Sequence, residues 1–122
     1  MFKRVAFTMY PVSDMARAVA FYSDVLGLPG CKELVPGKWV EYDMPQSGCF
    51  ALTTMMADMI PDGQRGGCLA FEVEDLQGLC ATLKDKGVTF HNDIFESPVC
   101  HGAMIQDTEG NLVMLHQLKR AS

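Results

Sequence analysis

The chain carries the same pattern twice, and this internal repeat restricts its possible folds more than any other feature. In each copy an apolar, strand-like run ends at a Val-x-Asp motif, an amphipathic helix follows, and a glycine ends the helix. The motifs end at Asp14 and Asp75, and the glycines are Gly27 and Gly87. The two aspartates lie 61 residues apart, which is half of the 122-residue chain. A repeat this long in a chain of single-domain length predicts two similar modules within one domain, residues 1–122.

The first copy reads as a βαβββ module of about residues 1–54. Residues Val5–Tyr10 predict a buried strand, and Pro11 is expected to end its pairing. Asp14 or Ser13 can cap the following helix, whose apolar stripe should pack on a sheet. This stripe consists of Ala18, Phe21, Tyr22, Val25 and Leu26. Turn sequences rich in proline and glycine then separate three predicted strands, Cys31–Val35, Trp39–Asp43 and Cys49–Thr54.

The second copy, about residues 68–122, follows a linker-like stretch of residues 55–67. Residues Cys68–Val73 predict a strand, and Asp75 should cap a helix with the stripe Leu76, Leu79, Cys80 and Leu83. Three more strands are predicted, at Val88–His91, Ala103–Gln106 and Leu112–Leu118. The fold class is therefore α+β, built from two tandem βαβββ modules.

Composition and charge exclude several classes of protein. Hydrophobic residues make up 48% and charged residues 20%, as in folded globular proteins. No run of 18 apolar residues and no apolar N-terminal run of signal-peptide length occurs, which favours a cytoplasmic protein without a membrane partner. Five cysteines without a Cys-x-x-Cys motif argue against a disulfide framework or a zinc knuckle. A net charge of −5 without a basic cluster argues against nucleic acid.

Three motifs resemble the vicinal oxygen chelate superfamily, which includes glyoxalase I, bleomycin-resistance proteins and extradiol dioxygenases. They are the stretch from Pro11 to Leu28, the repeated Val73-Glu74-Asp75, and the late turn Asp107-Thr108-Glu109-Gly110-Asn111. The resemblance spans nearly the whole chain. It implies two curved mixed sheets that enclose a cleft, each with its helix outside, and a homodimer.

The same resemblance implies a divalent metal, bound by one residue from the first and last strand of each module. In this chain those positions fall on Phe7, Ala51 (or Leu52, if the register slips), Cys68 and Met114. Divalent metals of this family need imidazole and carboxylate ligands, which none of these residues offers. We therefore expect no divalent metal at the family positions and predict no cofactor.

If these four residues face the cleft, strand alternation sends further side chains to the same face. The predicted ligand-binding residues are Phe7, Met9, Trp39, Glu41, Ala51, Thr53, Cys68, Ala70, Met114 and His116. In the strand Trp39–Asp43, Trp39 and Glu41 are expected to face the cleft, because Val40 and Tyr42 suit the helix side better. Trp39 is equally compatible with ordinary core packing, and His116 with a structural role.

Three functions remain open. The first is metal-independent binding of a small, aromatic or cationic molecule, as in bleomycin-resistance proteins. The second is a metal-independent isomerase or lyase with Glu41 or His116 as acid or base. The third is a metalloenzyme of glyoxalase or dioxygenase type with displaced ligands, drawn from His116, Glu41, Glu72 and His101. Cys100 and His101 are adjacent on a predicted strand and should point to opposite faces, so His101 is not expected to activate the thiol.

Overall fold

The structure, a computed structural model, describes residues 5–46, 48–55, 68–98 and 100–119. The chain divides into a first unit, residues 1–62, and a second unit, residues 63–122, which are described one at a time. Of the predicted linker, residues 56–67 lie outside the described residues. None of the described helices is long and apolar enough to cross a membrane.

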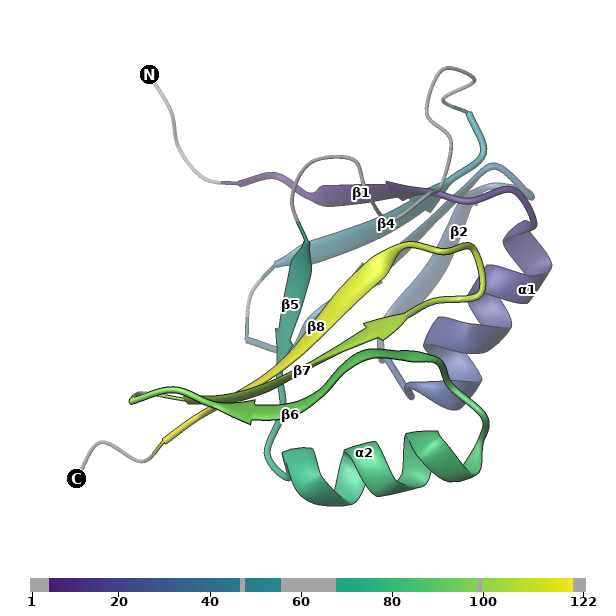
Figure 1. Cartoon of the computed structure of the whole chain (residues 1–122). Helices are drawn as coiled ribbons and strands as arrows, with labels where there is room; N and C mark the ends of the chain where they lie inside the picture. Colours follow the sequence, from purple (N-terminus) through teal and green to yellow (C-terminus); the bar gives the residue numbers. More distant parts are fainter. Residues whose placement is uncertain (1–4, 47, 56–67, 99, 120–122) are drawn as a thin grey trace. The chain divides into compact units, whose positions relative to one another are not determined.

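Each unit is a βαβββ module with one four-stranded mixed sheet, as predicted (Figure 1). In the first unit the sheet order is β1-β4-β3-β2, with β1 parallel to β4 and the other pairs antiparallel. The second unit repeats this topology in the order β5-β8-β7-β6. The first unit contains β1 (Thr8–Pro11), α1 (Met15–Val19), a π-helical segment η1 (Ala20–Val25), β2 (Cys31–Val35), β3 (Trp39–Asp43) and β4 (Cys49–Thr53). The second contains β5 (Leu69–Glu72), α2 (Leu76–Asp85), β6 (Phe90–Glu96), β7 (Cys100–Gln106) and β8 (Leu112–Leu118).

The repeated aspartates and glycines have the roles that the sequence indicates. Asp14 caps α1 by accepting a hydrogen bond from the backbone N–H of Arg17 at 3.0 Å, and Asp75 accepts one from Gly78 at the same distance. Gly27 and Gly87 follow the two helical segments with φ of 78° and 79°. Glycine adopts this left-handed conformation without the strain that a Cβ would add.

Pro11 does not end the first strand, which corrects the prediction. The strand β1 begins at Thr8 and includes Pro11, and the N–H of Val12 still donates to the carbonyl of Thr53 at 2.9 Å. Successive N–H groups of a strand point to opposite sides, so the nitrogen of Pro11 points away from β4. Because β1 is an edge strand of this sheet, no ladder bond is lost there.

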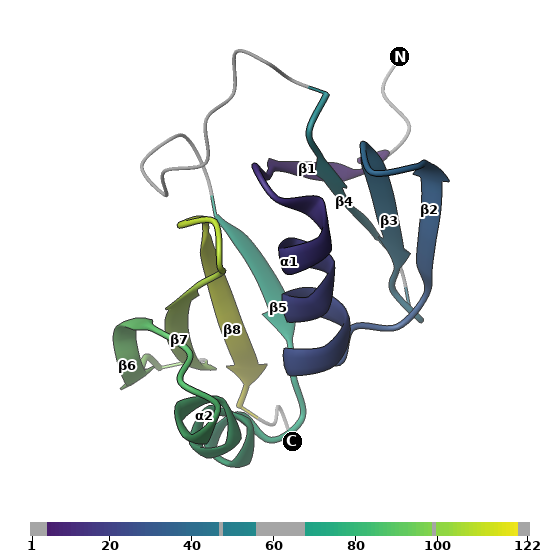
Figure 2. The same ribbon diagram turned by 90° about the vertical axis from the view of Figure 1, so that its right-hand side faces the viewer.

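The helix of the first unit changes to π geometry at Ala20, which the apolar spacing did not indicate. The N–H of Leu26 donates to the carbonyl of Phe21, five residues back, at 2.9 Å. The stripe still packs on the sheet: Ala18, Phe21 and Tyr22 are buried, and α1 contacts β4 (Figure 2). The expected apolar face is therefore present although the helical repeat is interrupted.

Aromatic rings form much of the core of the first unit. Tyr22 of η1 lies with its ring centroid 4.9 Å from that of Phe50 and 6.3 Å from that of Tyr42. The hydroxyl of Tyr42, although its residue is buried, is hydrogen-bonded to the Ser23 hydroxyl at 2.8 Å. Because both hydroxyls are satisfied, a buried tyrosine is tolerated between sheet and helix.

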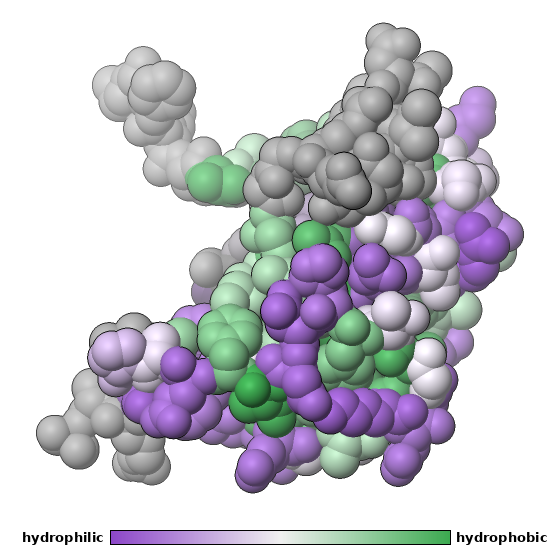
Figure 3. All heavy atoms as spheres, in the orientation of Figure 1, coloured by the Kyte–Doolittle hydropathy of each residue, from purple (hydrophilic) through white to green (hydrophobic). Residues whose placement is uncertain are grey.

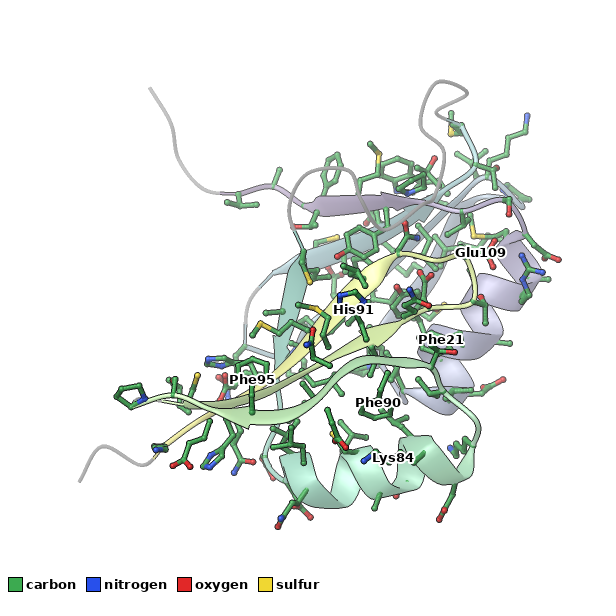
Figure 4. The ribbon with its side chains drawn as sticks, in the orientation of Figure 1. Phe21, Lys84, Phe90, His91, Phe95 and Glu109 are labelled. Carbon is green, nitrogen blue, oxygen red and sulfur yellow. The ribbon has the colours of Figure 1, made fainter. Side chains whose placement is uncertain are left out.

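In the second unit α2 packs on β7 and β8 through Leu76, Cys80 and Leu83, three of the four stripe residues. Lys84 extends its amino group over the ring of Phe90, 5.3 Å from the centroid (Figure 4). The predicted short strand Val88–His91 is instead the longer β6, which pairs irregularly with β7. β6 is an edge strand, and its polar residues are exposed. The sequence therefore shows no alternation of apolar and polar residues from which the length of this strand could be predicted.

The turn Asp107–Asn111 is built around a buried carboxylate. Asp107 accepts hydrogen bonds from the backbone N–H groups of Glu109 and Asn111, both at 2.8 Å, and from the Asn111 amide at 3.0 Å. Gly110 takes a φ of 87° in this turn. These hydrogen bonds account for the motif structurally and fix the alignment of β7 with β8.

Replacement of Tyr42 with phenylalanine tests the packing of the first unit. Burial raises the pKa of Tyr42 to about 12 from an ordinary value near 10, although the hydrogen bond to Ser23 lowers it. As pH rises, Tyr42 therefore loses its proton at a lower pH in the unfolded chain than in the folded protein. The stability contributed by neutral Tyr42 is present below pH 10 and is lost between about pH 10 and 12. We expect Tyr42→Phe to lower the free energy of unfolding by about 1 kcal/mol at neutral pH. Its free energy of unfolding should also fall less steeply between pH 10 and 12.

Urea unfolding followed at several pH values measures both effects. Ser23→Ala is the matched control, because it removes the hydrogen bond and keeps the phenol. An identical alkaline loss of stability in Tyr42→Phe and the unchanged protein would contradict the assignment.

Candidate functional site

The face of the first sheet that does not carry the helix, called here the first helix-free face, bears the candidate ligand residues of this unit. Val40 and Tyr42 are buried on the opposite face, where Tyr42 meets Tyr22 of η1. Trp39 and Glu41 alternate with them along β3 and are half-buried. Val40 and Tyr42 thus take the helix side, as predicted, whereas the cleft-facing position and the ligand-binding role of Trp39 and Glu41 stay predictions.

Trp39 and Glu41 are joined by a direct hydrogen bond on this face. The indole N–H of Trp39 donates to a carboxylate oxygen of Glu41 at 2.9 Å. Phe7, which is 44% exposed and precedes β1, meets the indole edge to face, with 5.4 Å between centroids and 89° between planes. The hydrogen bond and the ring contact both restrict the orientation of the indole.

The strand register completes the face. Ala51 stands beside Met9 of β1 and Glu41 of β3, and Thr53 stands beside Trp39. Met9 is half-buried, whereas Ala51 and Thr53 are 0% and 1% exposed. Of the predicted ligand residues in this unit, Phe7, Met9, Trp39 and Glu41 therefore offer exposed surface.

The thiol of Cys49, at the end of the same face, is held in its protonated form. Burial raises its pKa to about 11, and the nearby carboxylates of Glu41 and Asp43 add to this effect. A nucleophilic cysteine needs the opposite shift. Cys49 is thus unsuited to covalent catalysis at neutral pH.

The second helix-free face, the corresponding face of the second sheet, holds a histidine and a carboxylate in direct contact. Glu72 and His116 are partners across β5 and β8. One Glu72 oxygen lies 2.5 Å from Nδ1 of His116, and the other accepts the backbone N–H of Leu118 at 2.8 Å. These bonds lower the pKa of Glu72, the His116 bond contributing most. The ionised carboxylate favours a proton on Nδ1, which leaves Nε2 of His116 to serve as the acceptor nitrogen.

The sequence indicated His116 but not this partnership. The sequence suggested Glu72 only as a displaced metal ligand. The register of the parallel strands β5 and β8, which brings Glu72 next to His116, cannot be read from the residue pattern. Once the register is known, the repeat relates the two units: Met9 pairs with Ala51 as Ala70 pairs with Met114, and the next pair on the same face of the second sheet is Glu72 with His116. The same correspondence selects Ala51, rather than Leu52, as the counterpart of Met114.

Phe95 of β6 borders His116 on this face. Phe95 is 38% exposed and lies opposite Gly102, which is itself the β7 partner of His116 (Figure 4). A Cβ on Gly102 would approach Cζ of Phe95 to 2.5 Å, so the ring rests directly on the glycine. The sequence gave no indication of this pair.

Cys100 and His101 are successive residues of β7 and therefore lie on opposite faces of the second sheet. Cys100 is buried with Sγ 3.1 Å from the Ser97 hydroxyl, whereas His101 points to the helix side, with Nε2 3.9 Å from Glu96. The expected separation of Cys100 and His101 is thus confirmed. A cavity of about 300 Å³ is lined by His101 and the start of α2. His91 is exposed. In Figure 3 hydrophilic side chains cover most of α2, while hydrophobic ones show among the strands above it.

The residues at the metal positions of the family do not fit a divalent ion. Phe7 and Ala51 have no donor atoms, and Cys68 and Met114 offer only sulfur. Within the described parts of the chain, no three His, Cys, Asp or Glu side chains come together as a metal site. Glu72 and His116 are a pair, and His101 lies on the other side of the sheet.

The chain belongs to the glyoxalase/bleomycin resistance protein/dioxygenase superfamily, whose family model matches residues 4–115. A probable lactoylglutathione lyase of Vibrio parahaemolyticus is 28% identical over 130 residues, covering 98% of this chain and 94% of that protein. TnmS3, an antibiotic binding protein from Streptomyces sp. CB03234, has a solved structure with a TM-score of 0.79 and 27% identity, covering 97% and 98% of the two chains. Lactoylglutathione lyase from Agrobacterium tumefaciens shares the fold, with a TM-score of 0.73 at 19% identity over 93% and 92%.

Gly102→Ala tests whether the second helix-free face depends on the contact with Phe95. The new methyl group would displace the ring of Phe95. We expect the free energy of unfolding to fall by roughly 1 kcal/mol, which is at the low end for overpacking because the ring is partly exposed and can move. In a Phe95→Ala background the same change should cost much less. Chemical denaturation of the four proteins in this cycle measures the coupling, and equal costs in both backgrounds would refute the contact.

Proposed function

We propose that the protein binds a small, planar organic molecule on the first helix-free face, without a divalent metal. The observation that carries this proposal is the hydrogen-bonded pair Trp39 and Glu41, half-buried on the face that lacks the helix. The ligand class is aromatic, and a positive charge on it would complement Glu41 and the net charge of −5.

The indole is suited to stacking because its polar group is already satisfied. Its N–H is used by Glu41, Phe7 packs perpendicular to it, and the residue is half-buried, so part of the indole remains exposed for contact with a ligand. A free tryptophan would lose rotamer freedom on binding, whereas this one is already oriented. The carboxylate beside the ring supplies the charge that selects among aromatic ligands.

The relatives support a binding role as one established use of this fold. TnmS3, which is 27% identical along almost the whole chain, is described as an antibiotic binding protein. The probable lactoylglutathione lyase of Vibrio parahaemolyticus points instead to an enzyme. The lack of nitrogen and oxygen donors at Phe7, Ala51, Cys68 and Met114 favours binding over metal-dependent lyase chemistry. We further propose that the protein is cytoplasmic and that it acts as a homodimer, the latter as the family resemblance implies.

Titration with two probes, bleomycin and the planar cation proflavine, tests the binding proposal in the presence of a chelator. Trp39 is the only tryptophan, so its fluorescence reports on this face alone. We expect saturable quenching by at least one probe. By calorimetry, Trp39→Ala should weaken its binding by several-fold to some tens-fold, because a cation over an aromatic ring contributes about 0.5–2 kcal/mol.

Glu41→Gln should weaken the cationic probe selectively, and Gln77→Ala, at an exposed residue of α2 in the second unit, is the control that should leave binding unchanged. Binding that is unaffected by Trp39→Ala, or that requires an added divalent metal, would refute the proposal. Circular dichroism confirms that each variant is folded.

A second candidate function is metal-independent proton transfer, which the pair Glu72 and His116 favours. Glu72 is anchored by Leu118 and fixes Nδ1 of His116, so Nε2 can accept a proton from a substrate. His116 is the catalytic residue of this candidate, and Glu72 is a positioning residue. Glu41 is already occupied by Trp39 and is less suited to the role.

The ring opening of 5-nitrobenzisoxazole, which begins with removal of one C–H proton, tests this candidate. We expect His116→Asn to lower the rate at least about a hundredfold, the lower end of the range for general bases, and Glu72→Gln to have an intermediate effect. NMR titration of the Glu72 carboxyl gives an independent readout. Its pKa lies below the ordinary value mainly because of the hydrogen bond with His116, so this bond to the ionised carboxylate stabilises the fold above that ordinary value and is lost as pH falls through the folded pKa.

In His116→Asn the pKa of Glu72 should therefore move upward. Equal rates for the unchanged protein and His116→Asn would exclude the proton-transfer role, whatever the carboxyl titration shows.

A further inference from the structure

Three sulfur-containing side chains, those of Cys68, Met104 and Met114, are neighbours on the second helix-free face. We propose that these residues form a binding site for a soft monovalent cation, Cu(I) or Ag(I). Two of them, Cys68 and Met114, stand where the family would place ligands to a divalent metal, whereas Met104 has no counterpart in that set.

The backbone brings the three side chains together. Sγ of Cys68 lies 3.4 Å from Sδ of Met104. Met104 and Met114 are directly opposite across β7 and β8, a pairing that puts their Cβ atoms about 4.5–5.5 Å apart. On its other side Met114 is paired with Ala70, whose methyl group leaves space for the longer side chain. Methionine has three rotatable bonds, so both thioethers can turn toward one ion near the thiol.

The chemistry of this set selects the ion. Thiolate and thioether ligands favour Cu(I), whereas divalent hard cations need carboxylate or several imidazole ligands. The nearby His116 has its Nδ1 engaged by Glu72. One thiolate and one monovalent cation neutralise each other, so the site adds no net charge to a face that also carries Phe95 and Ala70.

Binding is a simple exchange without electron transfer. The S–H bond of Cys68 breaks, a bond from sulfur to the metal forms, and one proton is released to solvent for each ion bound. The two thioethers add their lone pairs and release nothing. Proton release and affinity should therefore depend on Cys68, whereas Met104 and Met114 should affect affinity alone.

Ordinary packing of sulfur side chains would give the same distances, and methionine-to-leucine changes separate the two explanations. Leucine keeps most of the volume and apolar character of methionine but has no donor atom. A packing role predicts a change in stability without a change in metal affinity. A ligand role predicts the reverse.

The experiment uses the full chain in a Cys31→Ser, Cys49→Ser background, since these cysteines are exposed or half-buried while Cys80 and Cys100 are buried. The reduced protein competes anaerobically with bathocuproine disulfonate for Cu(I), and Ag(I) is measured by calorimetry. We expect one ion per chain. Met104→Leu and Met114→Leu should each weaken binding at least tenfold with little change in melting temperature, and Cys68→Ser should abolish stoichiometric binding and proton release.

Met55→Leu, at an exposed methionine of the first unit, is the matched control and should bind as the background protein does. If both methionine variants bound the metal with unchanged affinity, the thiol of Cys68 alone would hold the ion, and the proposed three-ligand site would be wrong. Unchanged metal binding in Cys68→Ser would also refute the site. The site is independent of the proposed ligand face, so Trp39→Ala should leave its metal affinity unchanged. Failure of either proposal is thus visible without reference to the other.

Discussion

The two-residue alternation of the sheets is the constraint on which the rest of the structure depends. Each unit has one helical segment, and that segment covers one face of a four-stranded sheet. Val40 and Tyr42 in β3, like Val113 and Leu115 in β8, are consequently committed to the helix side. Their neighbours Trp39, Glu41, Met114 and His116 must then occupy the other face. A shift of one residue in register would exchange the functional and structural sets completely.

The chemistry of the helix-free faces follows from which side chains this alternation selects. In the first unit the selected groups include an indole, a phenyl ring, a thioether and the carboxylate of Glu41, a combination suited to holding an aromatic molecule. In the second unit they include a paired histidine and carboxylate and a group of sulfur-containing side chains. The family positions carry no nitrogen or oxygen ligand, so a shared fold places different chemistry at the same points of the sheet.

Much of the fold was predictable because the repeat, the caps and the apolar spacing are local signals. Three strands, Cys31–Val35, Trp39–Asp43 and Leu112–Leu118, have the predicted bounds, and Asp14 and Asp75 cap their helices. The inward and outward residues of β3 were also predictable, since tyrosine and valine beneath a helix differ plainly from tryptophan and glutamate. These features depend on sequence neighbours alone.

The features that could not be predicted depend on contacts between residues distant in sequence. The pairing of Glu72 with His116 requires the register of two parallel strands, and the packing of Phe95 on Gly102 requires the irregular pairing of β6 with β7. The π-helical segment and the passage of β1 through Pro11 are local departures imposed by the sheet and its edge. The polar strand β6 gave no alternation from which its length could be recognised.

The indole N–H resonance of Trp39 offers the most direct measurement of the central claim, that the first helix-free face binds an aromatic ligand without a divalent metal. One tryptophan gives one indole cross-peak in a proton–nitrogen correlation spectrum, and its hydrogen bond to Glu41 makes it sensitive to any molecule that stacks beside it. In chelator-treated protein, we expect a saturable shift of this peak on titration with proflavine or bleomycin. The shift should be smaller in Glu41→Gln. A peak that stays in place with both probes, or that moves only after a divalent metal is added, would contradict metal-independent binding on the first helix-free face.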